Sequence, residues 1–141
     1  MENKATSVLV IEEHPLMRES LCAAIAAESD LRVLKTAANF EGAFELILSS
    51  QHDVLFLSEK PDIVLLALGN PGIEDLKLMD SLLRKWHGTP ILALTRAEVP
   101  GQEQAALAHG AHAVLTKSVS REELLNGLRA IKTSSQIALH H

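Results

Sequence analysis

The sequence contains no tyrosine, one tryptophan and a single cysteine. That cysteine, Cys22, cannot form a disulfide within the chain, and its place in an apolar helical pattern indicates a core position. No apolar run approaches the roughly 18 residues that span a membrane. The first residues lack the basic start and apolar stretch of a signal peptide. The net charge of −5 leaves no basic surface of the kind that binds nucleic acid. These absences predict a cytoplasmic protein without membrane contact.

The length and composition are those of one globular domain. The chain has 141 residues, of which 47% are hydrophobic and 22% charged, and this suffices for one hydrophobic core. We therefore expect a single domain over residues 1–139. The closing pair, His140-His141, is set aside as either the remnant of a purification tag or native sequence.

Short apolar, β-branched runs alternate along the chain with segments of helical periodicity. The predicted strands cover residues 8–11, 31–36, 63–68, 91–95 and 113–116. The predicted helices cover residues 15–28, 40–48, 73–86, 101–109 and 120–131. This alternation indicates βαβ units with right-handed crossovers. The expected fold is a doubly wound, five-stranded parallel sheet with helices on both faces, a three-layer α/β/α arrangement.

Residues 49–58 do not fit this alternation. The connection they form is longer than usual for an α/β domain. Its apolar centre, residues 54–57, is compatible with an extra strand, a helix extension or a packed loop, and the sequence does not choose among these.

Polar side chains stand at the ends of three of the predicted strands, and a glycine follows another. Glu12 and Glu13 come after the first strand, Gly69 lies just beyond the third, Thr95 ends the fourth and Lys117 follows the fifth. In an open α/β sheet, ligands bind beyond the carboxyl ends of the strands. Two acids, a hydroxyl and an ammonium at one edge suit a hard cation together with a phosphoryl group.

Four segments, at residues 8–21, 61–72, 91–95 and 110–117, contain motifs in a fixed order that cover nearly the whole chain. The first has an acidic pair before His14-Pro15-Leu16, the third ends in a hydroxyl and the fourth ends in a lysine. Together they resemble the receiver domains of bacterial response regulators, in particular the NarL-type branch of the LuxR family. The resemblance implies a flavodoxin-like (βα)5 fold and a role in two-component signal transduction.

The sequence departs from this family at the centre of the pocket. Ala67 stands where the resemblance implies the aspartate that accepts the phosphoryl group, and a methyl group cannot act as that nucleophile. Glu12 and Glu13 replace two shorter aspartates. Because Mg²⁺ demands near-ideal octahedral geometry, binding by Glu12, Glu13 and the Gly69 carbonyl is disfavoured. We expect no cofactor.

Several pocket residues also have simpler explanations. Val114 occupies the position of the aromatic residue that switches in the family. Without a phosphoryl group, Lys117 is expected to pair with Glu12 or Glu13, which then form a solvated pair at a strand end. Thr95 is expected to satisfy backbone groups.

The histidines are expected on the surface and the tryptophan in the core, and none of them is expected to form a binding site. His14, at the start of a helix, is expected to lie on the surface. His109 and His112 flank the helix stop at Gly110, and we expect them to be exposed. Trp86 ends an amphipathic helix and is expected to cover the core.

We therefore predict an atypical receiver, a pseudo-receiver that is not an enzyme and acts by phosphorylation-independent protein contact, as a homodimer. Receivers of this kind pair through the first and last helices, or through the fourth helix, fifth strand and fifth helix. The residues expected at such a surface are Leu16, Leu21, Leu124, Leu125 and Leu128. Contact with DNA would require a C-terminal helix-turn-helix domain, which the resemblance implies for a full-length regulator and which this chain lacks.

Three alternatives remain open from the sequence. Ala67 could be an engineered change in an otherwise phosphorylatable receiver. The pocket could bind a small anion through Thr95, Lys117 and the backbone after Ala67. The fold could also support an enzyme, although the sequence shows no pair of nucleophile and base.

Overall fold

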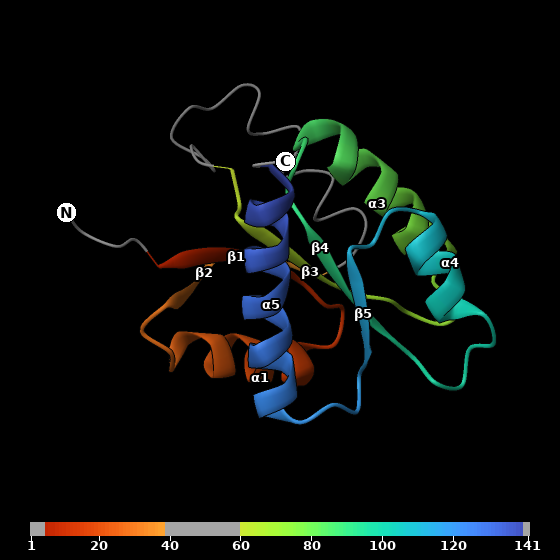
Figure 1. Cartoon of the computed structure of the whole chain (residues 1–141). Helices are drawn as coiled ribbons and strands as arrows, with labels where there is room; N and C mark the ends of the chain where they lie inside the picture. The colour runs from red at the N-terminus through yellow and green to blue at the C-terminus, as the bar shows by residue number, and fades with distance from the viewer. Residues whose placement is uncertain (1–4, 39–59, 140–141) are drawn as a thin grey trace, which may run out of the picture.

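The structure, a computed structural model, describes residues 5–38 and 60–139 (Figure 1). Within these residues five parallel strands form one sheet in the order β2-β1-β3-β4-β5. The strands are β1 (Thr6–Ile11), β2 (Leu31–Ala37), β3 (Ile63–Ala67), β4 (Ile91–Thr95) and β5 (Ala113–Thr116). The helices in this part of the chain are α1 (Pro15–Ala26), α3 (Ile73–Lys85), α4 (Gln102–Ala108) and α5 (Arg121–Leu139). The predicted doubly wound parallel sheet is confirmed.

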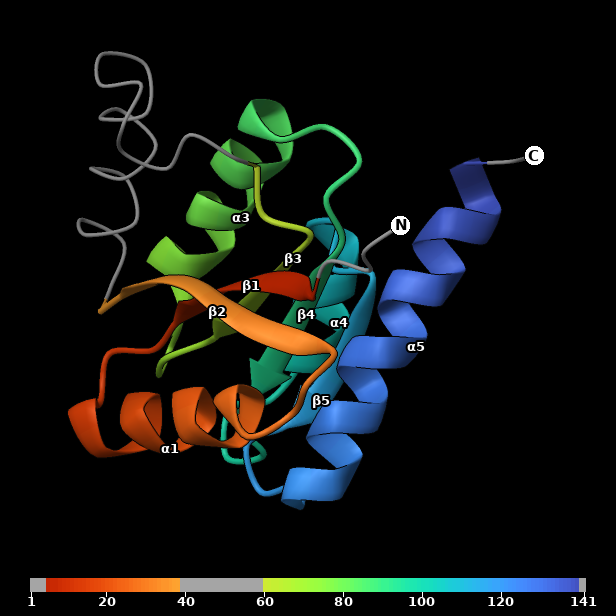
Figure 2. The same ribbon diagram turned by 90° about the vertical axis from the view of Figure 1, so that its left-hand side faces the viewer.

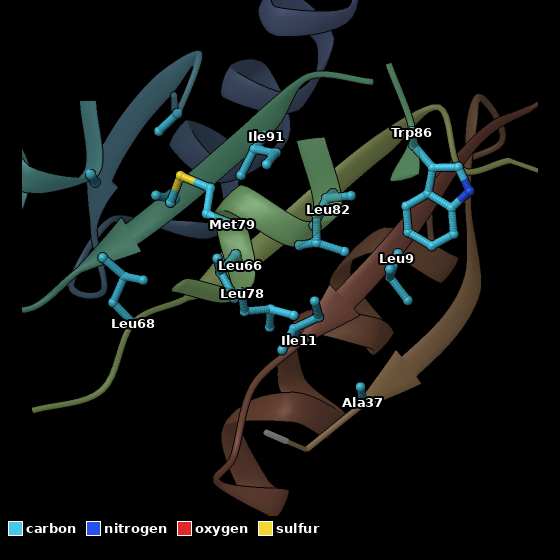
Figure 3. Packing of buried hydrophobic residues seen from close by; sticks show 14 residues of the cluster. Leu9, Ile11, Ala37, Leu66, Leu68, Leu78, Met79, Leu82, Trp86 and Ile91 are labelled. Atoms are coloured by element: carbon cyan, nitrogen blue, oxygen red, sulfur yellow. The ribbon is translucent and has the colours of Figure 1, made fainter. Parts of the chain in front are cut away.

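Helices cover both faces of the sheet, with α1 and α5 on one side and α3 and α4 on the other (Figures 1 and 2). Successive strand residues alternate between the two layers. Leu9 and Ile11 belong to the apolar cluster under α3 and α4, whereas Val8 and Val10 belong to the cluster under α1 and α5. Trp86 closes the first cluster at the end of α3 (Figure 3), so its predicted core position is confirmed.

The predicted element boundaries agree with the structure to within a few residues, except at the C-terminal end of α5. The capping box is confirmed, because Ser120 Oγ accepts the Glu123 N–H and Glu123 Oε1 accepts the Ser120 N–H, both at 3.1 Å. The helix was expected to end at Ile131 but continues to Leu139, since residues 132–139 contain neither glycine nor proline to stop it.

Two of the expected segments lie outside the described residues: the helix over 40–48 and the connection over 49–58. No helix in the part of the chain that the structure describes is long and apolar enough to cross a bilayer.

A close contact at Gly110 fixes the turn from α4 into β5. Gly110 has φ +112°, and a Cβ there would lie 2.5 Å from Leu83 Cδ1 of α3. The next residues join the strands, because the His112 N–H donates to Ile91 O at 2.9 Å. The Ile91 N–H in turn donates to His112 Nδ1 at 3.0 Å. His112 is exposed, as predicted, but its ring also closes the start of the β4–β5 pairing.

Candidate functional site

Parallel strands bring the predicted pocket residues to one edge of the sheet. Ala67 ends β3 and Thr95 ends β4, while Glu12 and Lys117 directly follow β1 and β5. The pairing of Ala67 with Leu94 fixes the relative height of these strand ends. The carboxyl ends of β1, β3, β4 and β5 therefore place the acid, the alanine, the hydroxyl and the ammonium together, as the sequence predicts.

Glu12 is the buried acid of this edge. Its side chain is fully buried, and Lys117 Nζ lies 3.1 Å from its Oε1. Oε1 accepts no well-aligned hydrogen bond within the described residues, so the Lys117 ammonium is what offsets its charge. The other oxygen, Oε2, accepts the backbone N–H of His14 at 3.0 Å, and His14 Nδ1 lies 3.0 Å from the same atom.

These contacts decide the ionisation of Glu12. Burial alone would raise the pKa of the Glu12 carboxyl, but the His14 N–H and the Lys117 ammonium outweigh it, and the pKa lies below its usual value. The predicted partnership of Lys117 with an acid after the first strand is confirmed. The prediction of a solvated acidic pair is wrong for Glu12, because the side chain turns inward to the ammonium, and holds for Glu13, which is exposed.

Ala67 lies in an apolar environment. It is 6% exposed, and its methyl group belongs to the same cluster as Leu65 and Leu94, under α1 and α5. Beside it, the buried Thr95 hydroxyl donates to the carbonyl of Leu115 at 3.4 Å, so the simpler explanation of Thr95 is confirmed. Position 67 thus offers neither a nucleophile nor a ligand for a cation.

Gly69, two residues beyond Ala67, has both backbone groups bonded to side chains. Its N–H donates to Asp75 Oδ2 at 2.9 Å, and its carbonyl accepts from Gln102 Nε2 at 2.8 Å. Glu13 Oε1 lies close by, 3.3 Å from where a Cβ on Gly69 would stand. The pKa of Asp75 is raised, because burial of its carboxyl together with the Glu13 charge outweighs the Gly69 hydrogen bond.

Asp75 and Gln102 were not predicted as site residues. Each binds backbone groups of a neighbouring loop, an interaction that leaves no periodic pattern in a sequence. Asp75 at least stands in the first turn of a helix, where an acidic side chain can reach back to a preceding N–H. No comparable signal marks Gln102.

The residues present do not fit the Mg²⁺ ion that the fold family implies. Magnesium requires several oxygen ligands in near-ideal octahedral geometry. Ala67 supplies no carboxylate, the Glu12 carboxylate is held by Lys117, and the Gly69 carbonyl is bonded to Gln102. Over residues 5–38 and 60–139 no group of three acidic, histidine or cysteine side chains is placed to hold a metal.

A cavity of about 310 Å³ opens between the loops that follow β1, β4 and β5. Two cationic side chains line it, Lys117 and Arg96. Both are already paired with acids: Lys117 with Glu12, and Arg96 Nε with Glu98 Oε2 at 2.6 Å. An anion entering the cavity would therefore have to compete with a carboxylate at each cation.

The predicted interface residues divide into a buried set and one exposed residue. Four are buried in the core between the sheet and helices α1 and α5: Leu21, Leu124, Leu125 and Leu128. Their prediction as a contact surface is wrong, because these leucines form the inward stripe of each helix. Leu16 is 81% exposed. The other large apolar side chains exposed among the described residues are Ile73 at 57% and Leu107 at 48%.

The strand order, the acids after β1, the hydroxyl ending β4 and the lysine after β5 define a doubly wound α/β domain of the receiver class. The comparison with known families agrees: the chain belongs to the response regulator receiver domain family, which matches residues 8–129.

Individual relatives show how far the similarity extends. The chain is 30% identical over 122 residues to the nitrate/nitrite response regulator protein NarL of Escherichia coli (strain K12), covering 86% of this chain and 52% of that protein. The chain thus spans about half the length of that relative.

Two solved structures share the fold. One is the signal receiver domain of response regulator NarL from Mycobacterium tuberculosis, with a TM-score of 0.74 and 24% identity over 92% of this chain and 98% of that one. The other is a CheY-like receiver domain protein from Methanospirillum hungatei JF-1, with a TM-score of 0.77 and 16% identity over 96% of this chain and 99% of that one.

Proposed function

We propose that this receiver domain works without phosphorylation, as a non-catalytic module of bacterial signal transduction. The observation behind the proposal is the 3.1 Å ion pair between Lys117 and the fully buried Glu12, next to a methyl group at position 67. In a phosphorylated receiver the lysine and the hydroxyl would face a phosphoryl oxygen. Here both are engaged within the chain, and Ala67 has no atom that could accept the group.

Protein contact, in particular homodimerisation, is the action we propose. Among the described residues, β5 is an edge strand whose residues are all half-buried, and Leu107 on the neighbouring α4 is 48% exposed. An apolar side chain beside a sheet edge suits contact with a second copy of the chain. We propose the α4–β5–α5 face, with Leu107 replacing the buried leucines as its apolar contact.

The proposed setting is transcriptional regulation in the bacterial cytoplasm. This chain matches about half the length of NarL. In the proposed full-length protein a C-terminal helix-turn-helix domain would contact DNA, while the receiver would set the distance between two such domains.

Sedimentation velocity over a concentration series tests this proposal, with and without Mg²⁺ and beryllofluoride, a phosphoryl mimic. A dimer that the additives leave unchanged supports phosphorylation-independent association. Dimerisation only in the presence of the additives would contradict it and favour a phosphorylatable pocket.

A matched pair of variants locates the contact surface. Leu107→Glu and Leu16→Glu each place a charge on an exposed leucine, on α4 and α1 respectively. The proposal expects the first to weaken the dimer and the second to leave it intact. The reverse result would move the contact to the α1 side.

A further inference from the structure

The Gln102 side chain connects the loop that follows β3 to the loop that follows β4. Gln102 is the first residue of α4 and is 4% exposed. Its Oε1 accepts the backbone N–H of Arg96 at 2.7 Å, within the loop that follows β4. Its Nε2 donates to the carbonyls of Gly69 at 2.8 Å and Pro71 at 3.3 Å, in the loop that follows β3. One amide therefore uses its acceptor on one loop and its donors on the other.

The backbone at Gly72 makes room for this amide. Gly72 has φ +82°, a backbone conformation that residues other than glycine rarely adopt. A Cβ at Gly72 would also lie 2.9 Å from Gln102 Nε2 and 2.9 Å from the Gly69 carbonyl oxygen. Glycine is thus required at this position both by the turn and by the close approach of Gln102.

The loop after β3 is held on its other side by Asp75. The Gly69 N–H donates to Asp75 Oδ2 while the Gly69 carbonyl accepts from Gln102. The hydrogen bonds of Gln102 go to other backbone groups and not to that N–H. Any change at the Gly69 N–H on substitution of Gln102 must therefore be transmitted through the loop.

We infer that Gln102 is a positioning residue that couples the loop after β3 to the loop after β4, so that the two loops open as one unit. The coupling holds the edge of the sheet beside Ala67 in one arrangement without a phosphoryl group. The role without a phosphoryl group rests on the proposed function. In that role, Gln102 supplies the internal contact that would replace phosphorylation in setting the conformation of the loops.

Two substitutions separate the two ends of the amide. Gln102→Leu removes the donors and the acceptor in a side chain of similar size. Gln102→Glu keeps the acceptor for the Arg96 N–H but removes the donor and places a carboxylate against two carbonyl oxygens. Gln104→Leu, at an exposed position of the same helix, is the matched control.

Native-state hydrogen exchange, followed by NMR at the Gly69 and Arg96 amides, measures the coupling. In Gln102→Leu both amides are expected to exchange faster, by a factor of up to about ten, because the loops lose the hydrogen bonds that Gln102 makes to them. In Gln102→Glu the Gly69 amide is expected to accelerate by a similar factor while the Arg96 amide keeps its protection. The control should match the wild type. If the Gly69 amide kept its wild-type rate in both variants, Gln102 would serve its own loop alone and the inference would be overturned.

The wild-type protein gives a second test that needs no variant. Coupled loops predict that the Gly69 and Arg96 amides open with the same free energy and the same dependence on denaturant. Clearly different values would overturn the inference. Because these measurements do not depend on association, they remain separate from the sedimentation result. A dimer that forms only with beryllofluoride would contradict the proposed function. The exchange rates would still decide the role of Gln102.

Discussion

Replacing Lys117 with methionine removes the charge that faces the buried Glu12 carboxylate. Removing one partner of a buried ion pair destabilises a protein by about 3–5 kcal/mol. We expect the low end, about 3 kcal/mol at pH 7, because the His14 N–H still donates to Glu12 and protonation of the carboxyl limits the loss. Glu12→Gln should be less destabilising, at about 1–3 kcal/mol, because the Lys117 side chain lines the open cavity and its ammonium can turn to water.

Lys117 also determines how the contribution of Glu12 to stability changes with pH. In the wild type the pKa of Glu12 is lowered from 4.5, so its contribution to stability is present above about pH 4.5 and is lost as the pH falls through the folded-state pKa. Without Lys117, burial becomes the dominant effect and the pKa should rise. The contribution then has the opposite sign: it is present at low pH and lost as the pH rises through the raised pKa.

Urea unfolding from acidic to neutral pH measures both effects. The difference in unfolding free energy between wild type and Lys117→Met should be largest at neutral pH and shrink towards acidic pH. Lys77→Met, at an exposed position on α3, is the control and should lose less than about 0.5 kcal/mol. A loss below about 1 kcal/mol at pH 7, with the pH dependence of the wild type, would refute the reasoning, since the pair would then behave as a screened surface contact.

Three further predictions concern other parts of the chain. Ala67→Asp should stay unlabelled by acetyl phosphate and Mg²⁺ in intact mass spectra, because the acids that would hold the metal are still glutamates; robust labelling would show otherwise. The His112 side chain is exposed overall, but partial desolvation of its ring, which accepts the Ile91 N–H, lowers its pKa from 6.5. Wild-type stability should therefore fall as the pH drops below about 6.5. His112→Asn, whose amide oxygen can still accept the Ile91 N–H, should lack this fall in urea unfolding, and an equal fall in both proteins would assign it to another group. Gly101→Ala should lower the free energy of unfolding by about 1 kcal/mol, because alanine disfavours the left-handed φ of 76°. Gly110→Ala should lower it by about 1–3 kcal/mol more, because its Cβ would also overlap α3. Equal losses for these two alanine variants would mean that the overlap relaxes freely.

The fold was predictable because its signals are local. Continuous apolar runs predicted the buried strands, and the Ser120–Glu123 capping box fixed the start of α5. The end of α5 was not predictable from apolar spacing, because residues 132–136 are polar while containing no residue that stops a helix. Nor could apolar spacing separate core from interface. Leu128 and Leu16 follow similar helical patterns, yet one is fully buried and the other 81% exposed, since only packing on the sheet decides which side of a helix is covered.

Part of the candidate site was predictable, but Asp75, Gln102 and the hydrogen bonds were not. The rule that ligands bind at the carboxyl ends of parallel strands placed Glu12, Thr95 and Lys117 together. The inward turn of Glu12, which brings its carboxylate to both Lys117 and the His14 N–H, was not predicted. The contacts of Gln102 lie up to 33 positions along the chain from it, and a polar side chain that binds distant backbone leaves no trace in composition or periodicity.

We propose that the pocket beside Ala67 does not bind a phosphoryl group. The most direct test is a series of ¹H–¹⁵N NMR spectra of the wild-type protein, titrated with beryllofluoride in the presence of Mg²⁺. We predict that the backbone amides of Thr95 and Lys117 keep their chemical shifts throughout the titration. Saturable shifts at these two amides would contradict it, because they would show that the pocket still binds a phosphoryl mimic despite Ala67.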